Sequence, residues 1–265
     1  MASKGNSIGI IGGSGMLGSA ISKALLASDA FDHSNFWVSN RSGGAPDFGQ
    51  NLDIHVTKDN QELVDCCDVI LLCVPPAQFP DIDIRAPEQL IISVMAGVSI
   101  HEITSKTGAV RVVRAMSSPA AAMALAYSPW VANAEITAKD RTIVSSIFEA
   151  CGKTDEIFDE RQLDHFTAMT GPVPGFVAYF AQCMVDHATK QGIAPGVADR
   201  AIRQLFLASG TMLDNSAASP ADHVREMIEY AGTTAAGLNA MIGSGLSKTI
   251  SDGLLAAATK ARSMS

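Results

Sequence analysis

Three glycines near the start of the sequence have the spacing of a phosphate-binding turn. Gly13, Gly15 and Gly18 fit the pattern G-x-G-x-x-G, between an apolar segment at 8–11 and a helix expected to begin at Ser19. One glycine would allow a tight bend, one would let a pyrophosphate approach bare backbone, and one would let helix and strand pack closely. The alternative is a glycine-rich hairpin or surface turn. The residues expected to contact a dinucleotide here are Gly13, Ser14, Gly15, Met16 and Leu17.

The next predicted strand, at 36–40, indicates which dinucleotide would bind. An NAD site usually ends this strand with an acidic residue that bonds the ribose hydroxyls, but Asn40, Arg41 and Ser42 stand there instead. A guanidinium can pair with a phosphate through two donors, and a serine adds a hydroxyl. We therefore expect NADP, with NADPH preferred over NADH. The alternative for Arg41 is a solvated loop residue.

Three largely apolar segments predict parallel strands, the first of them apolar throughout and typical of a strand buried on both faces. They cover 69–74, 90–95 and 110–115, and they end at Pro75-Pro76, at Ala96-Gly97 and at 116–119. Ligands of open α/β sheets bind at the carboxyl edge of such strands. Val74, Pro75, Ala96 and Gly97 are therefore further candidates for cofactor contact. Additional strands are expected at 53–56, 125–131 and 153–158, with helices at 60–66 and 138–151.

From about residue 159 only helical patterns follow. Apolar residues recur three and four apart over 161–169, 176–191, 195–214, 221–229 and 246–261. The breaks lie at 171–175, which contains Pro172 and Val173, and at 231–234. The fold class expected is α/β, with an N-terminal Rossmann-type doubly wound parallel sheet over 1–158 and a C-terminal all-helical domain over 159–265.

Composition narrows the class of protein. The chain of 265 residues is 47% hydrophobic and 17% charged, which suits a globular protein with a sizeable core. A formal charge of −8 argues against a general nucleic-acid or anionic-membrane binder. The five cysteines and six histidines lack metal-ligand spacing, so we expect reduced thiols and no metal site. With a polar start and apolar runs too short to span a bilayer, the chain is expected to be cytoplasmic.

Together these segments resemble the pyrroline-5-carboxylate reductase family, NAD(P)H-dependent enzymes that make proline from a cyclic imine. The resemblance runs through the glycine turn with Met16 and through most of the chain. Its most specific part is Ala231-Gly232-Thr233-Thr234, followed by Ala-Ala-Gly-Leu. The other matching segments are 39–42, 67–71, 92–99 and 113–116.

The resemblance implies where a substrate would bind. In the family, backbone amides of the glycine-threonine loop hold the substrate carboxylate, and a threonine hydroxyl faces the imine nitrogen, a role that falls to Thr234. The substrate-binding residues implied are Ser118, Gly175, Gly232, Thr233 and Thr234. The family also implies a homodimer or higher homo-oligomer, formed through interleaved C-terminal helices, with the pocket shared between subunits. Imine reduction needs no strong base, because a cyclic imine can arrive protonated.

Three departures from the family pattern surround the implied pocket. They are the shortened Ser117-Ser118-Pro119 loop, the segment 170–176, and the shortened loop that follows Glu229-Tyr230. A different or bulkier cyclic imine is therefore an alternative substrate. Two other functions stay open: a hydroxyacid dehydrogenase that uses Lys190, and a non-catalytic NADP-binding regulator.

Overall fold

The computed structural model describes residues 6–28, 30–44, 48, 53–171 and 174–263. Contacts divide the chain into two compact units. The first unit is Met1–Pro172 together with Leu254–Ser265, and the second unit is Val173–Gly253. Residues 1–5 at the polar start, and Pro172 and Val173 in the predicted break, lie outside the described residues. The domain division at 158/159 stays a prediction.

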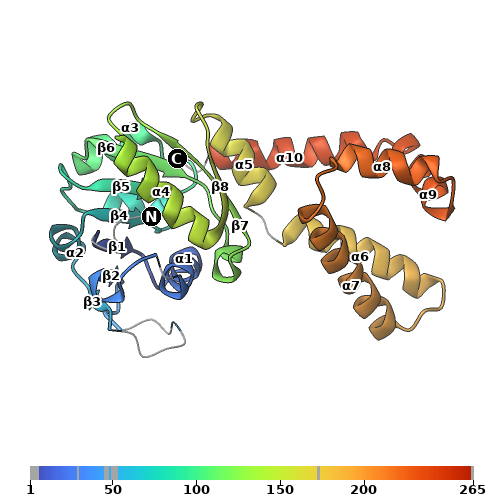
Figure 1. Cartoon of the computed structure of the whole chain (residues 1–265), viewed down its shortest axis with the longest axis horizontal. Helices are drawn as coiled ribbons and strands as arrows, with labels where there is room; N and C mark the ends of the chain where they lie inside the picture. The colour runs from blue at the N-terminus through green and yellow to red at the C-terminus, as the bar shows by residue number, and fades with distance from the viewer. Residues whose placement is uncertain (1–5, 29, 45–47, 49–52, 172–173, 264–265) are drawn as a thin grey trace. The chain divides into compact units, whose positions relative to one another are not determined.

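The described part of the first unit contains one sheet of eight strands, in the order β3-β2-β1-β4-β5-β6-β7-β8 (Figure 1). Neighbouring strands run parallel, except for the antiparallel pair β6 and β7. Strand order reverses beside β1, which creates the switch point at which α/β sheets bind ligands. This confirms the predicted doubly wound sheet. The strands are β1 Ile8–Ile11, β2 Phe36–Ser39, β3 His55–Thr57, β4 Val69–Leu72, β5 Leu90–Ser93, β6 Arg111–Ala115, β7 Ala126–Ala132 and β8 Gly152–Glu156.

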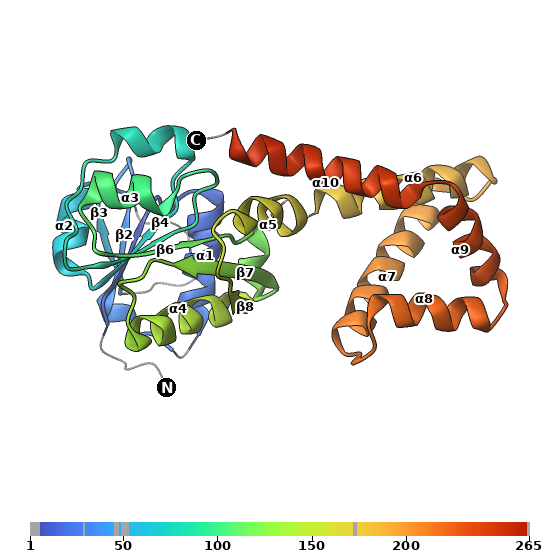
Figure 2. The same cartoon turned by 90° about the horizontal axis from the view of Figure 1, so that it is seen from above.

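Helices cover both faces of the sheet (Figure 2). Helices α1 (Met16–Ala27) and α4 (Ala138–Cys151) pack on one face, and α2 (Asn60–Cys66) and α3 (Ile100–Thr107) pack on the other. Successive strand residues alternate between the two cores: Leu71 belongs to the first, and Ile70 and Leu72 to the second. Burial on both faces explains why the central strands β4 and β5 are almost entirely apolar.

Local capping sets several helix starts. Asp59 accepts the N–H groups of Gln61 and Glu62 at the start of α2. Ser99 and Glu102 form a capping box at α3, as Thr137 and Asp140 do at α4. Hydrogen bonds from Ser99 lower the pKa of Glu102. The described connections also contain short 3₁₀ helices: η1 (His33–Asn35), η2 (Pro76–Asp81) and η3 (Pro119–Met123).

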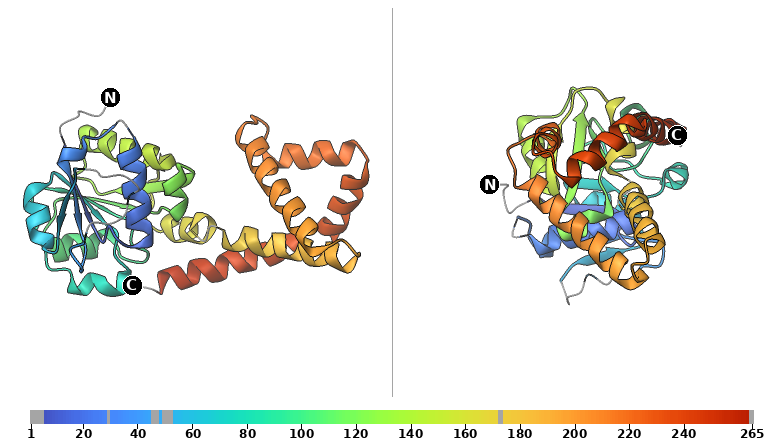
Figure 3. Two further views of the ribbon diagram at one scale, coloured as in Figure 1. Left: turned by 90° about the horizontal axis from the view of Figure 1, so that it is seen from below. Right: turned by 90° about the vertical axis from the view of Figure 1, so that its right-hand side faces the viewer.

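The C-terminal residues are helical, as predicted. Helix α5 (Gln162–Thr170) belongs to the first unit, and the second unit contains α6 (Gly175–Lys190), α7 (Pro195–Asp214), α8 (Pro220–Glu229) and α9 (Thr233–Gly243). Helix α10 (Leu246–Arg262) begins in the second unit and ends in the first. Helices α6 and α7 follow each other in the chain and pack together (Figure 3), and the rings of Phe180 and Phe206 meet edge to face at 6.0 Å between them. No helix among the described residues is long and apolar enough to cross a membrane.

Candidate functional site

The glycine turn bends at a different glycine from those in the predicted pattern. Gly12 has a φ of +86°, a backbone conformation that residues with a Cβ rarely adopt. The φ of Gly13 is not positive. The N–H groups of Gly12 and Gly13 donate to Ser39 O at 3.1 and 3.3 Å, which joins the turn to the end of β2. The pattern G-x-G-x-x-G therefore begins one residue after the glycine that makes the bend.

The other glycines allow close approach of backbone and side chains. A Cβ on Gly18 would lie 2.4 Å from Gly12 O, and one on Gly13 would lie 2.4 Å from Val38 Cγ1. Helix α1 begins at Met16 and not at Ser19, because the N–H of Ser19 already donates to Gly15 O at 2.8 Å and so closes the first helical turn. Gly15 is the N-cap and provides no side-chain cap. The first-turn N–H groups of Met16 and Leu17 thus face a position that bare backbone leaves open to an anion.

Asn40 organises the turn that follows β2. Its side-chain nitrogen donates to Gly44 O at 2.9 Å, and its Oδ1 accepts from Gly43 N at 2.7 Å and from Ser42 Oγ at 2.9 Å. Asn40 is buried, while Arg41 and Ser42 are exposed. Asn40 therefore shapes the turn that presents Arg41, and Ser42 shares in these bonds.

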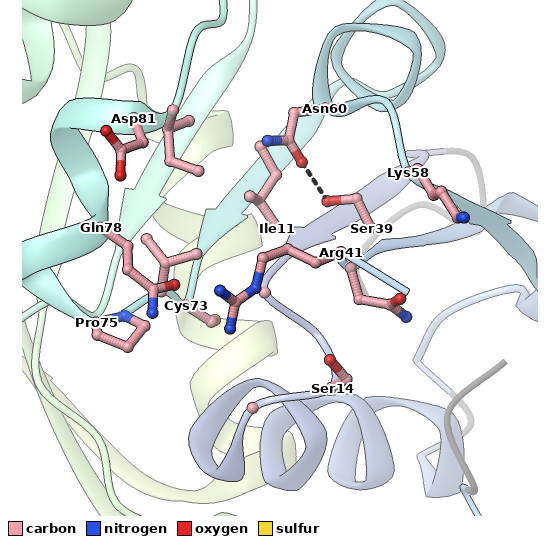
Figure 4. A pocket seen from close by; sticks show the side chains of 15 residues that line it. Ile11, Ser14, Ser39, Arg41, Lys58, Asn60, Cys73, Pro75, Gln78 and Asp81 are labelled. Atoms are coloured by element: carbon pink, nitrogen blue, oxygen red, sulfur yellow. Dashed lines mark hydrogen bonds between the residues drawn. The ribbon is translucent and has the colours of Figure 1, made fainter. Parts of the chain in front are cut away.

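A pocket of about 450 Å³ lies at the carboxyl ends of β1, β2 and β4. Figure 4 shows the Arg41 side chain crossing it between Ser14 and Gln78. The pocket brings together six predicted residues: Ser14, Gly15, Asn40, Arg41, Val74 and Pro75. The predicted contacts that do not line it are Gly13, Met16, Leu17, Ser42, Ala96 and Gly97.

Several lining residues were not predicted. Asn60 accepts a hydrogen bond from Ser39 Oγ at 2.7 Å, and Lys58, Gln78 and Asp81 contribute further polar groups. Lys58 and Asn60 follow β3, which lies beside β2. The strand order of a doubly wound sheet would have indicated this edge, but the order is not visible in the local pattern.

The pocket also contains a cysteine, Cys73. Burial raises the pKa of its thiol well above the ordinary value, and the nearby Cys151 raises it further. The thiol is therefore neutral at physiological pH and is unsuited to act as a nucleophile. Among the described residues, no group of three or more histidine, cysteine, aspartate or glutamate side chains could hold a metal ion.

A partly buried ion cluster lies just before the predicted substrate loop of the first unit. Arg114, at the end of β6, contacts Glu160 at 3.2 Å and Asp164 at 3.3 Å. Glu160 also accepts a hydrogen bond from Ile100 N at 2.9 Å, at the start of α3. The cluster thereby links β6, α3 and α5 immediately before the loop that contains Ser118, which is 2% exposed.

The remaining predicted residues lie on separate loops. Gly97 has φ +77° in the turn after β5, next to Ala96. In the second unit, Gly175 is the first residue of α6, and Lys190 is the last. Gly232 caps α9 without a side-chain bond, and Thr233 and Thr234 are exposed in its first turn. Whether Ser118 shares a pocket with these second-unit residues stays a prediction.

Comparisons with known proteins cover both parts of the chain. Residues 160–264 match the family model for pyrroline-5-carboxylate reductase dimerisation. Residues 7–97 match the model for NADP oxidoreductase, coenzyme F420-dependent. A pyrroline-5-carboxylate reductase of a Synechocystis species is 26% identical over 255 residues, which are 94% of this chain and 95% of that protein. The chain is thus similar to pyrroline-5-carboxylate reductases along nearly its whole length.

Solved structures of pyrroline-5-carboxylate reductases have the same fold. The 1-pyrroline-5-carboxylate reductase of Streptococcus pyogenes has a TM-score of 0.81 at 27% identity, covering 97% of this chain and 98% of that one. A Plasmodium falciparum pyrroline carboxylate reductase with NADP bound has a TM-score of 0.80 at 22% identity, covering 98% of each chain. The resemblance seen in the sequence is confirmed, and the dimerisation match supports a homo-oligomer.

Proposed function

We propose that this chain is an NADPH-dependent reductase that transfers a hydride to the C=N bond of a cyclic imine carboxylate, converting 1-pyrroline-5-carboxylate to proline. The observation that carries this proposal is the pocket at the switch point, where the glycine turn and Arg41 meet. The family match supports the reaction class.

The pocket fits a dinucleotide with a 2′-phosphate. Gly12, Gly13 and Gly15 carry no Cβ that would keep a pyrophosphate away from the backbone, and the first turn of α1 offers N–H donors. The strand β2 ends without a carboxylate, so nothing at that position repels a phosphate, and Arg41 can bind one with two donors. The bound NADPH would supply the hydride.

At the substrate end, we propose that the start of α9 holds the imine. Gly232 as N-cap leaves its helix-start N–H groups free of side-chain competition, and these can bind a carboxylate. The Thr234 hydroxyl would then bond the imine nitrogen. A homodimer or higher homo-oligomer would complete this pocket. All five cysteines are free, which supports action in the reducing cytoplasm.

A second candidate is the reduction of another cyclic imine by the same machinery. The observation that favours it is the altered loop before η3, where Ser128 Oγ donates to the buried Ser117 Oγ at 2.9 Å and Ser118 is buried. A loop tied down in this way would give a pocket of a different shape from that of a longer, polar loop.

The experiment is NADPH oxidation followed by absorbance, with 1-pyrroline-5-carboxylate and a panel of larger cyclic imines. We expect turnover on 1-pyrroline-5-carboxylate. Thr234→Ala should lower kcat by about 10- to 100-fold, the worth of one hydrogen bond to a charged group, with NADPH binding intact. Thr234→Ser should restore much of the rate. NADPH binding without turnover on any imine would contradict the proposal and favour a regulator.

A further inference from the structure

We propose that Lys58 is a second residue that binds the 2′-phosphate of NADPH, and that Lys58 and Arg41 together determine the preference over NADH. This inference rests on the proposed use of NADPH. It concerns a residue that follows β3, a strand that carries no part of the glycine turn. Lys58 lines the same pocket as Arg41.

Strand pairing places Lys58 beside the Arg41 turn. Strands β2 and β3 are parallel, and Ser39 is in register with Thr57. Asn40 N donates to Thr57 O at 3.2 Å, so the ladder continues to the last residue before Lys58. The two strands therefore release Arg41 and Lys58 at the same edge of the sheet, where the ribose of a dinucleotide lies in such folds.

The turn after β2 is shaped around the Lys58 side chain. Gly43 has φ +66°, and a Cβ there would lie 2.4 Å from Lys58 Cε and 2.7 Å from Cγ. The aliphatic stem of Lys58 thus runs against the bare backbone of Gly43. Because Asn40 Oδ1 holds Gly43 N at 2.7 Å, the turn and the lysine stem are held together.

Neither cation has an acidic partner among the described residues. The adjacent Asp59 accepts the N–H groups of Gln61 and Glu62, and Glu62 accepts from Thr57 Oγ1 at 2.5 Å. Figure 4 shows Arg41 and Lys58 on opposite sides of the strand end at Ser39. Both side chains are exposed, so each can turn toward a phosphate bound at this edge of the sheet and neutralise part of its charge. A phosphate monoester, with nearly two negative charges, suits this arrangement.

Direct binding tests this inference without requiring turnover. Calorimetry would compare NADPH with NADH, and adenosine 2′,5′-bisphosphate with adenosine 5′-monophosphate, on the full chain and on Lys58→Gln. We expect Lys58→Gln to weaken NADPH and the bisphosphate by about tenfold, the scale of one charge-assisted bond, and to leave NADH and the monophosphate nearly unchanged. Lys58→Arg should retain most of the affinity. The difference should shrink as salt is raised, because the site is exposed.

Lys139→Gln, on the exposed start of α4, is the matched control for loss of one lysine charge. Equal weakening of NADPH and NADH by Lys58→Gln, or an effect no larger than that of Lys139→Gln, would overturn the role of Lys58 and leave the proposed function standing. In a double-mutant cycle with Arg41→Ala, the two losses of NADPH binding free energy should be non-additive, since both side chains bind one phosphate. Failure of the unmodified chain to bind NADPH would overturn both this inference and the proposed cofactor.

Discussion

The two units of the chain bury their apolar side chains to very different extents. In the first unit, Ile21, Ile147 and Phe148 are completely buried. In the second unit, α6 and α8 contain no buried residue, and the only buried residues of α7 and α9 are Ala198 and Ala235. Large apolar side chains of the second unit stay exposed, among them Tyr179 at 69%, Leu207 at 65% and Met212 at 70%. The first unit therefore has a core of its own, whereas the second unit leaves large apolar side chains uncovered, as expected where helices form an interface between copies of a chain.

The largest difference in stability between the units is expected when one buried or exposed aromatic ring is removed from each. Phe148→Ala should lower the free energy of unfolding by about 3–5 kcal/mol at every protein concentration, because it leaves a cavity in a closed core. Phe180→Ala removes a ring that is 41% exposed, so its loss in dilute solution should be much smaller. Denaturant titrations over a range of protein concentrations measure both. Equal losses at the lowest concentration would mean that the second unit has a core of its own.

Deleting an ion pair should also cost much more stability in the first unit than in the second. Arg114→Met leaves the partly buried carboxylates of Glu160 and Asp164 without their cation, and should cost about 3 kcal/mol of unfolding free energy. Arg203→Met breaks the exposed pair with Asp199, and should leave thermal unfolding unchanged. If Arg114→Met unfolded like the unmodified chain, the cluster would not contribute to the stability of the first unit.

Two glycine substitutions sharpen the contrast further. Gly18→Ala places a methyl group against Gly12 O, and should cost about 1–3 kcal/mol along with a large part of the NADPH affinity. A methyl group at Gly210 in α7 meets nothing within 4 Å, so Gly210→Ala in dilute solution should stabilise the helix by up to about 1 kcal/mol. Thermal unfolding and NADPH titration check both. Intact NADPH binding by Gly18→Ala would argue against the glycine turn as the phosphate site.

Leu207→Glu is expected to change the stability of the fold least. Its effect should fall on self-association. A charge on this exposed face should weaken self-association by about tenfold or more, equivalent to about 1.4 kcal/mol, with helicity retained. Ala134→Glu adds the same charge to an exposed position of the first unit and should leave association unchanged. Sedimentation velocity distinguishes the two. An unaltered oligomer in Leu207→Glu would place the interface elsewhere.

The sequence predicts the elements well wherever burial or a proline leaves a local pattern. The helix at 195–214 has its predicted bounds because Pro195 begins it, and the buried strands are visible as apolar runs. The bend at Gly12 was missed because four glycines lie within seven residues, and spacing alone does not say which adopts a positive φ. Lys58 and Asn60 were missed because they reach the pocket only through the pairing of β3 with β2. The implied substrate residues stay a prediction, because they are divided between the two units, whose arrangement no local sequence pattern encodes.

The central claim is that this chain moves a hydride from NADPH to a cyclic imine carbon. The most direct test is a reaction of 1-pyrroline-5-carboxylate with NADPH that carries deuterium at C4 of the nicotinamide, on the transferred face, with the product analysed by mass spectrometry. The account predicts proline that carries one deuterium at the former imine carbon, formed in proportion to the NADPH consumed. Unlabelled proline, or NADPH that binds and is not consumed in the presence of the imine, would contradict it.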